Sequence, residues 1–371
     1  ALQDERQDYG GRVNASFKLF DDWLEVRPAV DYRQAARNNH YPNFQQAMRN
    51  NPTRSPYDPD SETGYNVWIN ESLDYNVVAD AMLEDYYGLD KWFKPEVNLK
   101  LNIKPIPGLN YQQVVGYENR QWELHQYWPS THRSEIDNSR KGHAHLAFSK
   151  TENLTSEGYF SYVKDFKGGH NLNATAGYSY FEVNGENFGM DNYNFSVDGI
   201  KYWDIGQGSY LTDGKAGMSS GKSVTERLFS FFARANYSYQ DKYMLSASIR
   251  HEGSSKFAAD NRWANFWSAT AGWRISNEEF MKDFDWLDDL KIRFGYGVTG
   301  NNDFSATYMA NMLGSDTNWM MPNGTWAYSY GKSQNVNPNL GWEEKKEWNL
   351  GVDYSFFEGR LYGKFDYYRR E

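Results

Sequence analysis

The sequence predicts an all-β protein: a transmembrane antiparallel β-barrel, to which this chain contributes about twelve strands of membrane-crossing length. Three observations carry this prediction. Apolar and polar residues alternate along segments of about ten residues. The connections between these segments are alternately short turns and long loops. Aromatic residues make up 18% of the chain although its mean hydropathy is only −0.85. A barrel explains this combination because one set of side chains faces lipid and the other faces water.

The alternation is clearest in residues 93–103, where nearly every second residue is apolar and the residues between are polar. A period of two residues indicates a strand rather than a helix. In a barrel, Leu99 and Leu101 would face lipid, whereas Lys100 and Asn102 would face the wet interior. No segment approaches the roughly 18 consecutive apolar residues of a transmembrane helix.

The same pattern recurs along the chain and defines each expected strand. In order, these are residues 11–20, 24–33, 93–103, 109–120, 157–166, 171–180, 227–239, 243–252, 264–276, 290–298, 344–356 and 360–370. The alternation continues to the end of the chain. We therefore expect a partial chain, with further strands that close the barrel lying outside it.

Short connections lie at one end of the predicted strands and long connections at the other. Turns of a few residues follow the odd-numbered strands, and a medium segment, 277–289, follows the ninth. The even-numbered strands lead into longer segments, namely 35–91, 121–156, 183–226, 253–263 and 299–343. Short periplasmic turns and long extracellular loops are typical of outer-membrane barrels. Residues 142–151 also alternate, and strand parity favours a strand extension or a hairpin within an extracellular loop.

A soluble β-sandwich is the main alternative fold, because it too has alternating strands. Sandwich strands are usually shorter, about five or six residues, and their loops do not sort by length to alternate ends. The barrel therefore explains the sequence better.

Composition and motifs exclude several functions. The chain has no cysteine and a net charge of −10, so disulfides, thiolate metal sites and a nucleic-acid partner are not expected. The SGKS run at 220–223 lacks the spacing and the strand–helix context of a phosphate loop. His143 and His145 could share a strand face, but no third metal ligand is identifiable. We expect no catalytic residues, no metal, no cofactor and no enzyme activity.

Residues 224–276 resemble the SusC/RagA family of TonB-dependent outer-membrane transporters. An Arg-x-Asn-Tyr strand, a Lys-Tyr turn, an Arg and a Gly-Ser-Ser-Lys-Phe loop, and a Gly-Trp strand carry the resemblance. The matching residues are Arg234, Asn236, Tyr237, Lys242, Tyr243, Arg250, Gly253, Ser254, Ser255, Phe257, Gly272 and Trp273. The resemblance covers about residues 223–371, and His251, Glu252 and Trp267 depart from the family pattern. The first two hundred residues or so match only in architecture.

The resemblance implies that residues 1–371 are the barrel segment of a TonB-dependent receptor. The full protein would be a roughly 22-stranded barrel with an N-terminal plug domain and a TonB box outside this chain. It would sit in the outer membrane of a Gram-negative, Bacteroidetes-type cell. A SusD-like surface lipoprotein would cover it, and TonB with ExbB and ExbD would energise it. Its ligands would be oligosaccharides or, in the RagA branch, peptides.

Aromatic residues in the expected extracellular loops are the candidate ligand site. They are Tyr127, Trp128, Tyr202, Trp203, Trp319, Trp326 and Tyr328. Sugar rings pack their apolar faces on such side chains, while neighbouring polar groups bond the hydroxyls. The same aromatics could instead pack loops together, form an interfacial girdle or contact the lipoprotein. We expect a glycan importer. The alternatives are a RagA-like oligopeptide importer and a passive or structural outer-membrane barrel.

Overall fold

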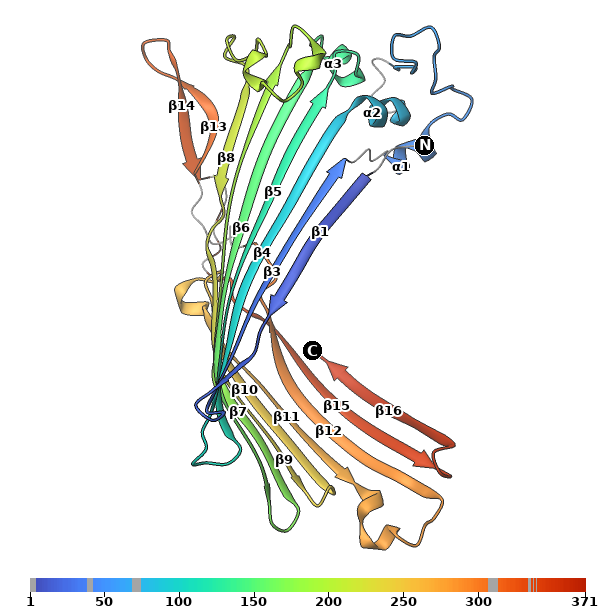
Figure 1. The fold of residues 1–371 in the computed structure, drawn as a ribbon, viewed down its shortest axis with the longest axis vertical. Helices are drawn as coiled ribbons and strands as arrows, with labels where there is room; N and C mark the ends of the chain where they lie inside the picture. The colour runs from blue at the N-terminus through green and yellow to red at the C-terminus, as the bar shows by residue number, and fades with distance from the viewer. Residues whose placement is uncertain are drawn as a thin grey trace.

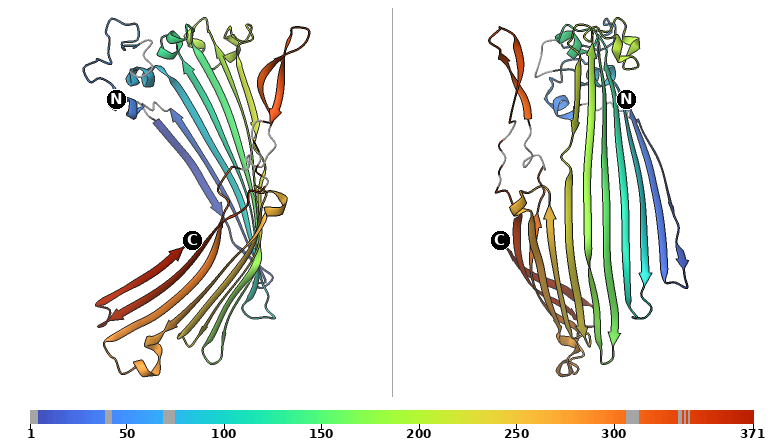
Figure 2. Two further views of the ribbon diagram at one scale, coloured as in Figure 1. Left: turned by 180° about the vertical axis from the view of Figure 1, so that it is seen from behind. Right: turned by 90° about the vertical axis from the view of Figure 1, so that its left-hand side faces the viewer.

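The computed structural model describes residues 5–38, 43–68, 75–305, 313–332, 335, 337 and 339–371, with the backbone alone for residues 313–318, 328–330 and 332. One antiparallel sheet of fourteen strands dominates it. The sheet curves like part of a cylinder wall and stays open between β1 and β16 (Figure 1) (Figure 2). The predicted all-β architecture is confirmed.

Twelve of the fourteen strands follow one another in chain order across the sheet, whereas β2 and β8 lie off this path. The strands are β1 (Glu5–Asn14), β2 (Phe17–Leu19), β3 (Leu24–Asn38), β4 (Asp85–Asn102), β5 (Leu109–Trp128), β6 (His143–Phe166), β7 (His170–Tyr193), β8 (Gly217–Lys222), β9 (Glu226–Tyr239), β10 (Tyr243–Ser254), β11 (Trp263–Arg274), β12 (Leu287–Asn301), β15 (Glu343–Phe356) and β16 (Leu361–Arg370). Each of the twelve predicted strands overlaps one strand of this path.

The short turns gather at one end of the sheet and the longer loops at the other, as the sequence predicts (Figure 1). Turn residues show why the short connections form. Gln240 and Asp241 adopt φ angles of 51° and 56°, which lets β9 turn directly into β10. Phe357 and Glu358 do the same between β15 and β16, followed by Gly359 at φ 78°.

Several strands are longer than predicted. β6 and β7 each have 24 residues, so segment 142–151 is the upper part of β6 rather than a separate hairpin. The predicted loops 121–156 and 183–226 were therefore drawn too long. The alternation of residues 142–151 belongs to this extension of β6, whose backbone ladder with β5 and β7 continues up to His143.

Short elements lie at the two ends of the sheet, most of them at the loop end. They are α1 (Phe44–Arg49), α2 (Val77–Leu83), α3 (Arg133–Asp137), the 3₁₀ turns η1 (Asp198–Ile200), η2 (Ile205–Gln207), η3 (Ala259–Asn261), η4 (Ile275–Asn277) and η5 (Glu279–Met281), and the hairpin of β13 (Leu313–Met320) and β14 (Trp326–Lys332). Of these, η4 and η5 belong to the turn end, between β11 and β12. Within the described residues, no helix combines the length and apolar character that a membrane crossing requires.

The two faces of the sheet differ in chemistry and in exposure. Along β10, exposed Leu245, Ala247 and Ile249 alternate with half-buried polar residues. This pattern is expected where polar side chains converge on the concave side of a curved sheet and apolar side chains splay apart on its convex side. Cross-strand pairs such as Val26 with Leu99 continue the apolar face from strand to strand. We call the convex, apolar side the outward face and the other side the inward face.

A change of residue type marks the upper limit of the apolar band. The outward residues Tyr32, Phe93, Tyr117, Tyr180 and Phe229 are aromatic. The next outward residues toward the loops are Gln34, Lys91, Asn119, Glu182 and Arg227. Aromatic girdles mark the membrane–water interfaces of outer-membrane barrels. Everything on the loop side of this row therefore lies above the membrane.

Candidate ligand site on the inward face

The upper ends of β5, β6 and β7 place aromatic and titratable residues in register on the inward face. Trp128 lies directly opposite His143, which lies opposite Tyr193. His145 lies opposite Asp191 one step nearer the membrane. Because cross-strand neighbours share a face, these side chains converge although they are far apart in the sequence.

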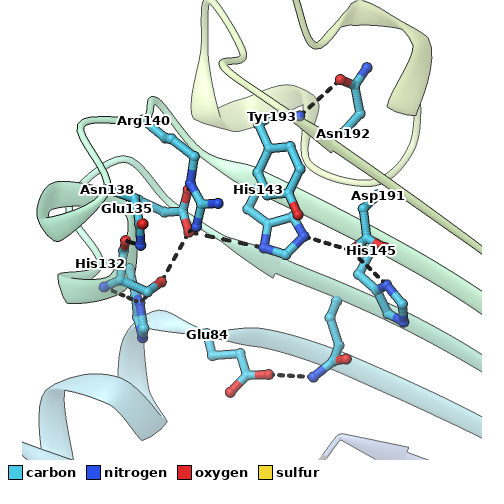
Figure 3. Close-up of polar contacts among 12 residues, drawn as sticks. Glu84, His132, Glu135, Asn138, Arg140, His143, His145, Asp191, Asn192 and Tyr193 are labelled. Atoms are coloured by element: carbon cyan, nitrogen blue, oxygen red, sulfur yellow. Dashed lines mark hydrogen bonds and ion pairs between the residues drawn. The ribbon is translucent and has the colours of Figure 1, made fainter. Parts of the chain in front are cut away.

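Three rings from three strands form a layered stack. The ring centroids of Trp128 and His143 are 4.5 Å apart at an interplanar angle of 21°, and those of His143 and Tyr193 are 4.2 Å apart at 26°. The guanidinium carbon of Arg140 lies 4.4 Å from the Tyr193 centroid and extends the stack. Figure 3 shows His143, Tyr193 and Arg140 layered in this way. Such contacts hold the rings in a fixed orientation.

Carboxylates fix the edges of the stack. Asp191 Oδ1 accepts a hydrogen bond from His143 Nε2 at 2.8 Å and another from His145 Nδ1 at 2.9 Å (Figure 3). Glu135 is fully buried, and Arg140 donates to its two carboxylate oxygens at 2.9 and 2.8 Å. A bidentate bond of this kind compensates a buried charge better than a single contact does. Among the described residues, no group of three or more His, Asp and Glu side chains is arranged to hold a metal ion.

Helix α3 closes the inward side of this cluster. Its N-cap is His132, whose Nδ1 accepts a hydrogen bond from the backbone N–H of Ser134 at 3.2 Å. The remaining ring nitrogen, Nε2, lies 3.5 Å from Asp80 Oδ1. Burial lowers the pKa of His132 to about 4, and the charge of Arg133 acts in the same direction. Burial also raises the pKa of Asp80, which Arg133 partly opposes. The histidine is thus neutral at pH 7.

The predicted loop aromatics fall into different environments. Trp128 is half-buried in the inward stack. Tyr127 and Tyr202 are buried together on the outward side, in a cluster with Ala144 and Phe195, so their rings are covered by protein. The hydroxyl of Tyr127 donates to Asp198 Oδ1 at 2.7 Å. The structure brings these two tyrosines together but separates them from Trp128.

The other predicted aromatics are exposed. Trp203 follows Tyr202 in the chain, with 76% of its surface open, and Trp319 and Trp326 are similarly open on the β13–β14 hairpin. Tyr328 lies on β14, and its side chain is outside the described part. A ligand role for any of these residues remains a prediction. Sequence analysis missed Glu135, Arg140 and Asp191. Strand register brings Asp191 opposite His145, whereas Glu135 on α3 and Arg140 just before β6 join the cluster through their own ion pair.

The family-motif residues build the sheet and its turns. Lys242 Nζ, Tyr243 Oη and Trp273 Nε1 all donate to the carboxylate of Glu278, at 3.1, 2.7 and 3.0 Å, and this ties the turn after β9 to the segment after β11. On the inward wall, Asn236 accepts from Ser246 at 2.7 Å, and Arg250 donates to Ser179 at 3.0 Å.

The loop part of the motif forms a small packed unit. Phe257 is buried between Trp342 and Phe304, and Ser255 Oγ accepts from the Arg227 backbone at 2.7 Å. A side chain at Gly253 would come within 2.7 Å of the Trp263 ring, which explains a glycine there. The motif is therefore a signature of the fold.

Comparison with known proteins decides the family. A family model described as "TonB dependent receptor-like, beta-barrel" matches residues 22–371. The chain belongs to this family. It is 31% identical to TonB-dependent receptor P39 of Formosa agariphila over 280 residues, which are 72% of this chain and 25% of that protein. It is 37% identical to TonB-dependent receptor SusC of Bacteroides thetaiotaomicron over 163 residues, 43% of this chain and 16% of SusC.

Solved structures show the same fold. The RagAB peptide transporter matches with a TM-score of 0.81 and 20% identity, over 98% of this chain and 40% of that one. The chain spans about a quarter of the length of the Formosa receptors P39 and P3, at 25% of each. The family comparison confirms the resemblance to SusC and RagA. It places these strands in the outer membrane of a Gram-negative, Bacteroidetes-type cell.

Proposed function

We propose that the whole protein is a SusC-like importer that takes up oligosaccharides across the outer membrane. A SusD-like surface lipoprotein would cover its extracellular mouth, and TonB with ExbB and ExbD would supply energy. Residues 1–371 would contribute the barrel wall and would catalyse no reaction. Membership of the TonB-dependent receptor β-barrel family supports the transport class, and the inward face above the membrane supports the ligand class.

One observation carries the preference for glycans. The inward stack of Trp128, His143 and Tyr193 borders on Asp191 and Arg140, so flat apolar rings and charged hydrogen-bonding groups lie side by side. A sugar ring needs this combination, because it offers apolar C–H faces and a rim of hydroxyl groups. Trp128 is only half-buried, so part of its indole ring remains accessible to a ligand.

Two other functions are weighed against this one. A RagA-like peptide importer has support from the fold likeness to the RagAB peptide transporter, although 20% identity bears on fold alone. A passive or structural barrel would use its loops to bind partners without energised uptake. Peptide side chains also pack on aromatic rings, so the ligand itself has to be measured.

The test is saturation binding to the intact protein complex, extracted in detergent, against defined oligosaccharides and oligopeptides of similar mass. Saturable binding of an oligosaccharide class is expected. Binding of peptides alone would assign the protein to the peptide branch and contradict the glycan proposal. Uptake of the bound ligand by cells should stop when a protonophore collapses the proton-motive force. Uptake that continues would instead indicate a passive barrel.

A matched pair of tryptophan variants tests the site. Trp128→Ala removes the inward ring, whereas Trp203→Ala removes an exposed ring that packs beside the outward tyrosine Tyr202. We expect about a tenfold weaker Kd for Trp128→Ala, equivalent to about 1.4 kcal/mol. We expect an unchanged Kd for Trp203→Ala, which would remove Trp203 from the predicted ligand residues. Equal losses, or no loss in either variant, would remove the inward stack from the ligand site.

A further inference from the structure

A second group of inward residues lies nearer the membrane, on β3, β4 and β5. Arg33 is directly opposite Trp92, and Trp92 is directly opposite Arg120. The guanidinium carbons of the two arginines lie 5.3 and 4.9 Å from the centroid of the Trp92 ring. Both distances are within the range of a cation–π contact, so one indole ring interacts favourably with two positive charges.

Further charged residues surround this row, and we call the set the arginine patch: Arg6, Arg33, Arg37, Arg120, Asp8 and Asp90. Asp8 pairs with Arg6 at 2.6 Å and with Arg33 at 2.8 Å. Asp90 lies 3.4 Å from Arg37 and 3.4 Å from Arg120. Each of the four guanidinium groups lies beside one of these two carboxylates. By formal charge the six side chains carry four positive and two negative charges, within a chain of net charge −10.

The residues of the patch differ in exposure. The side chain of Asp90 is only 4% exposed, whereas those of Arg33 and Arg120 are 50% and 51% exposed. Buried Asp90 therefore anchors Arg120 and Arg37, whereas the partner of Arg33 is Asp8, which is 39% exposed. The half-exposed guanidinium groups of Arg33 and Arg120 are accessible to water. A guanidinium has five such donors in a planar fork that fits the paired oxygens of a carboxylate, sulfate or phosphate.

The patch lies above the membrane on the path into the barrel. Arg33 directly follows Tyr32, and Trp92 directly precedes Phe93, the two aromatic residues that mark the membrane edge on β3 and β4. Strand parity puts Arg33 and Trp92 on the inward face, away from lipid. A ligand that enters the barrel from the extracellular side would pass this wall.

We propose that the arginine patch binds oxyanion groups of an acidic oligosaccharide, either uronic-acid carboxylates or sulfate esters. This inference rests on the proposed glycan import. Unlike charges so close attract strongly where water is partly excluded, and a ligand with regularly spaced anions would neutralise the surplus positive charge. The ring stack at Trp128 would then contact the faces of the sugar rings, and the arginine patch would bind the charged groups of the ligand.

The experiment measures Kd for the intact complex with four probes. They are an oligogalacturonate, a sulfated galactan oligosaccharide, its desulfated counterpart and a poly-glutamate peptide of similar charge. We expect one of the two acidic oligosaccharides to bind at least tenfold more tightly than the desulfated one. Its affinity should fall steeply between 50 and 500 mM NaCl, since salt screens such contacts.

Matched variants locate the binding. Arg33→Gln and Arg120→Gln should each weaken the acidic oligosaccharide about tenfold and leave a neutral one unchanged. Arg227→Gln is the control, because Arg227 is 57% exposed and paired with Glu182, but lies on the outward face. Arg33→Lys and Arg120→Lys keep the positive charge but lose the planar set of guanidinium donors. They should therefore weaken binding of the acidic oligosaccharide less than the glutamine variants do. They also remain informative if a glutamine variant fails to fold.

The outcomes separate this inference from the glycan proposal. Tight binding of the neutral oligosaccharide, unaffected by the glutamine variants, would overturn the arginine patch and leave glycan import standing. Tight binding of poly-glutamate with no oligosaccharide bound would overturn both. Equal losses for Arg33→Gln, Arg120→Gln and Arg227→Gln would show a general charge effect and would also overturn the patch.

Discussion

Tyr127 and Trp128 are neighbours in the chain, yet they belong to two different regions of the molecule. Tyr127 points outward and is 2% exposed, with its hydroxyl bonded to Asp198. Trp128 points inward and stacks on His143 in a half-open cluster. The outward region is a small packed core that fixes the loop after β7 to the wall, whereas the inward region presents rings and charges to the barrel mouth. One step along a strand therefore moves a side chain from a packed outward core to the half-open inward face.

The largest expected effect comes from a substitution in the outward core. Tyr127→Ala should lower local stability by about 3–5 kcal/mol, because it removes a large buried ring and leaves a cavity. Trp128→Ala should cost only about 0.5–1.5 kcal/mol, since the lost contacts are half-exposed ring stacking. Hydrogen–deuterium exchange in segment 194–216 would measure both. Faster exchange is expected for Tyr127→Ala alone, and equal effects in the two variants would contradict the distinction.

The second effect extends the comparison into the membrane. Leu99→Arg should destabilise the barrel by about 2–4 kcal/mol if the residue lies near the bilayer midplane, because a charge would then face lipid. Lys100→Ala on the inward face should change stability by about 0.5 kcal/mol or less. Denaturant titrations of folding in phospholipid vesicles would compare them. A similar cost for the two changes would mean that the faces are wrongly assigned.

A smaller effect is expected on the stability of the α3 region at acidic pH. The pKa of His132 is lowered from 6.5 to about 4 in the folded state, so the unfolded chain binds a proton more readily. Its contribution to stability is complete above pH 6.5 and is lost as pH falls toward about 4. The raised pKa of Asp80 acts in the opposite sense, because protonation relieves its buried charge. The net loss should therefore be modest and confined to the α3 region.

Exchange rates of amides 132–140, measured between pH 7 and pH 4 and corrected for intrinsic pH dependence, would show this loss. His132→Asn keeps an N-cap acceptor without a group that titrates in this range. Exchange in that variant should lose its excess acid sensitivity. An unchanged pH profile would remove His132 as the cause.

Much of the fold follows from alternation and turn chemistry. The segment around Leu99 and the turn at Gln240 and Asp241 are examples, because lipid on one face and tight hairpins leave clear patterns in sequence. The upper part of β6 was harder, since its alternation fits both a strand extension and a separate hairpin, and only the pairing with β5 and β7 distinguishes the two. The hairpin β13–β14 lies within the predicted loop 299–343 and was not predicted.

The candidate site was less predictable because it depends on register. Trp128 could be chosen by residue type, but its partners His143 and Tyr193 come from other strands. Arg33, Trp92 and Arg120 come from three strands that are far apart in the sequence, and nothing local to any one of them indicates the other two. A one-residue slip of register would have moved each side chain to the opposite face.

The most direct test of the two-faced wall is cysteine labelling in intact outer membranes. Residues 1–371 contain no cysteine, so single substitutions Leu99→Cys and Lys100→Cys each give one reactive site within this segment. A membrane-impermeant, water-soluble maleimide should label position 100 and spare position 99. The pair Ala247→Cys and Ser248→Cys repeats the test on β10, with position 248 labelled and position 247 protected. Equal labelling within both pairs would contradict the assignment of an outward lipid face and an inward wet face.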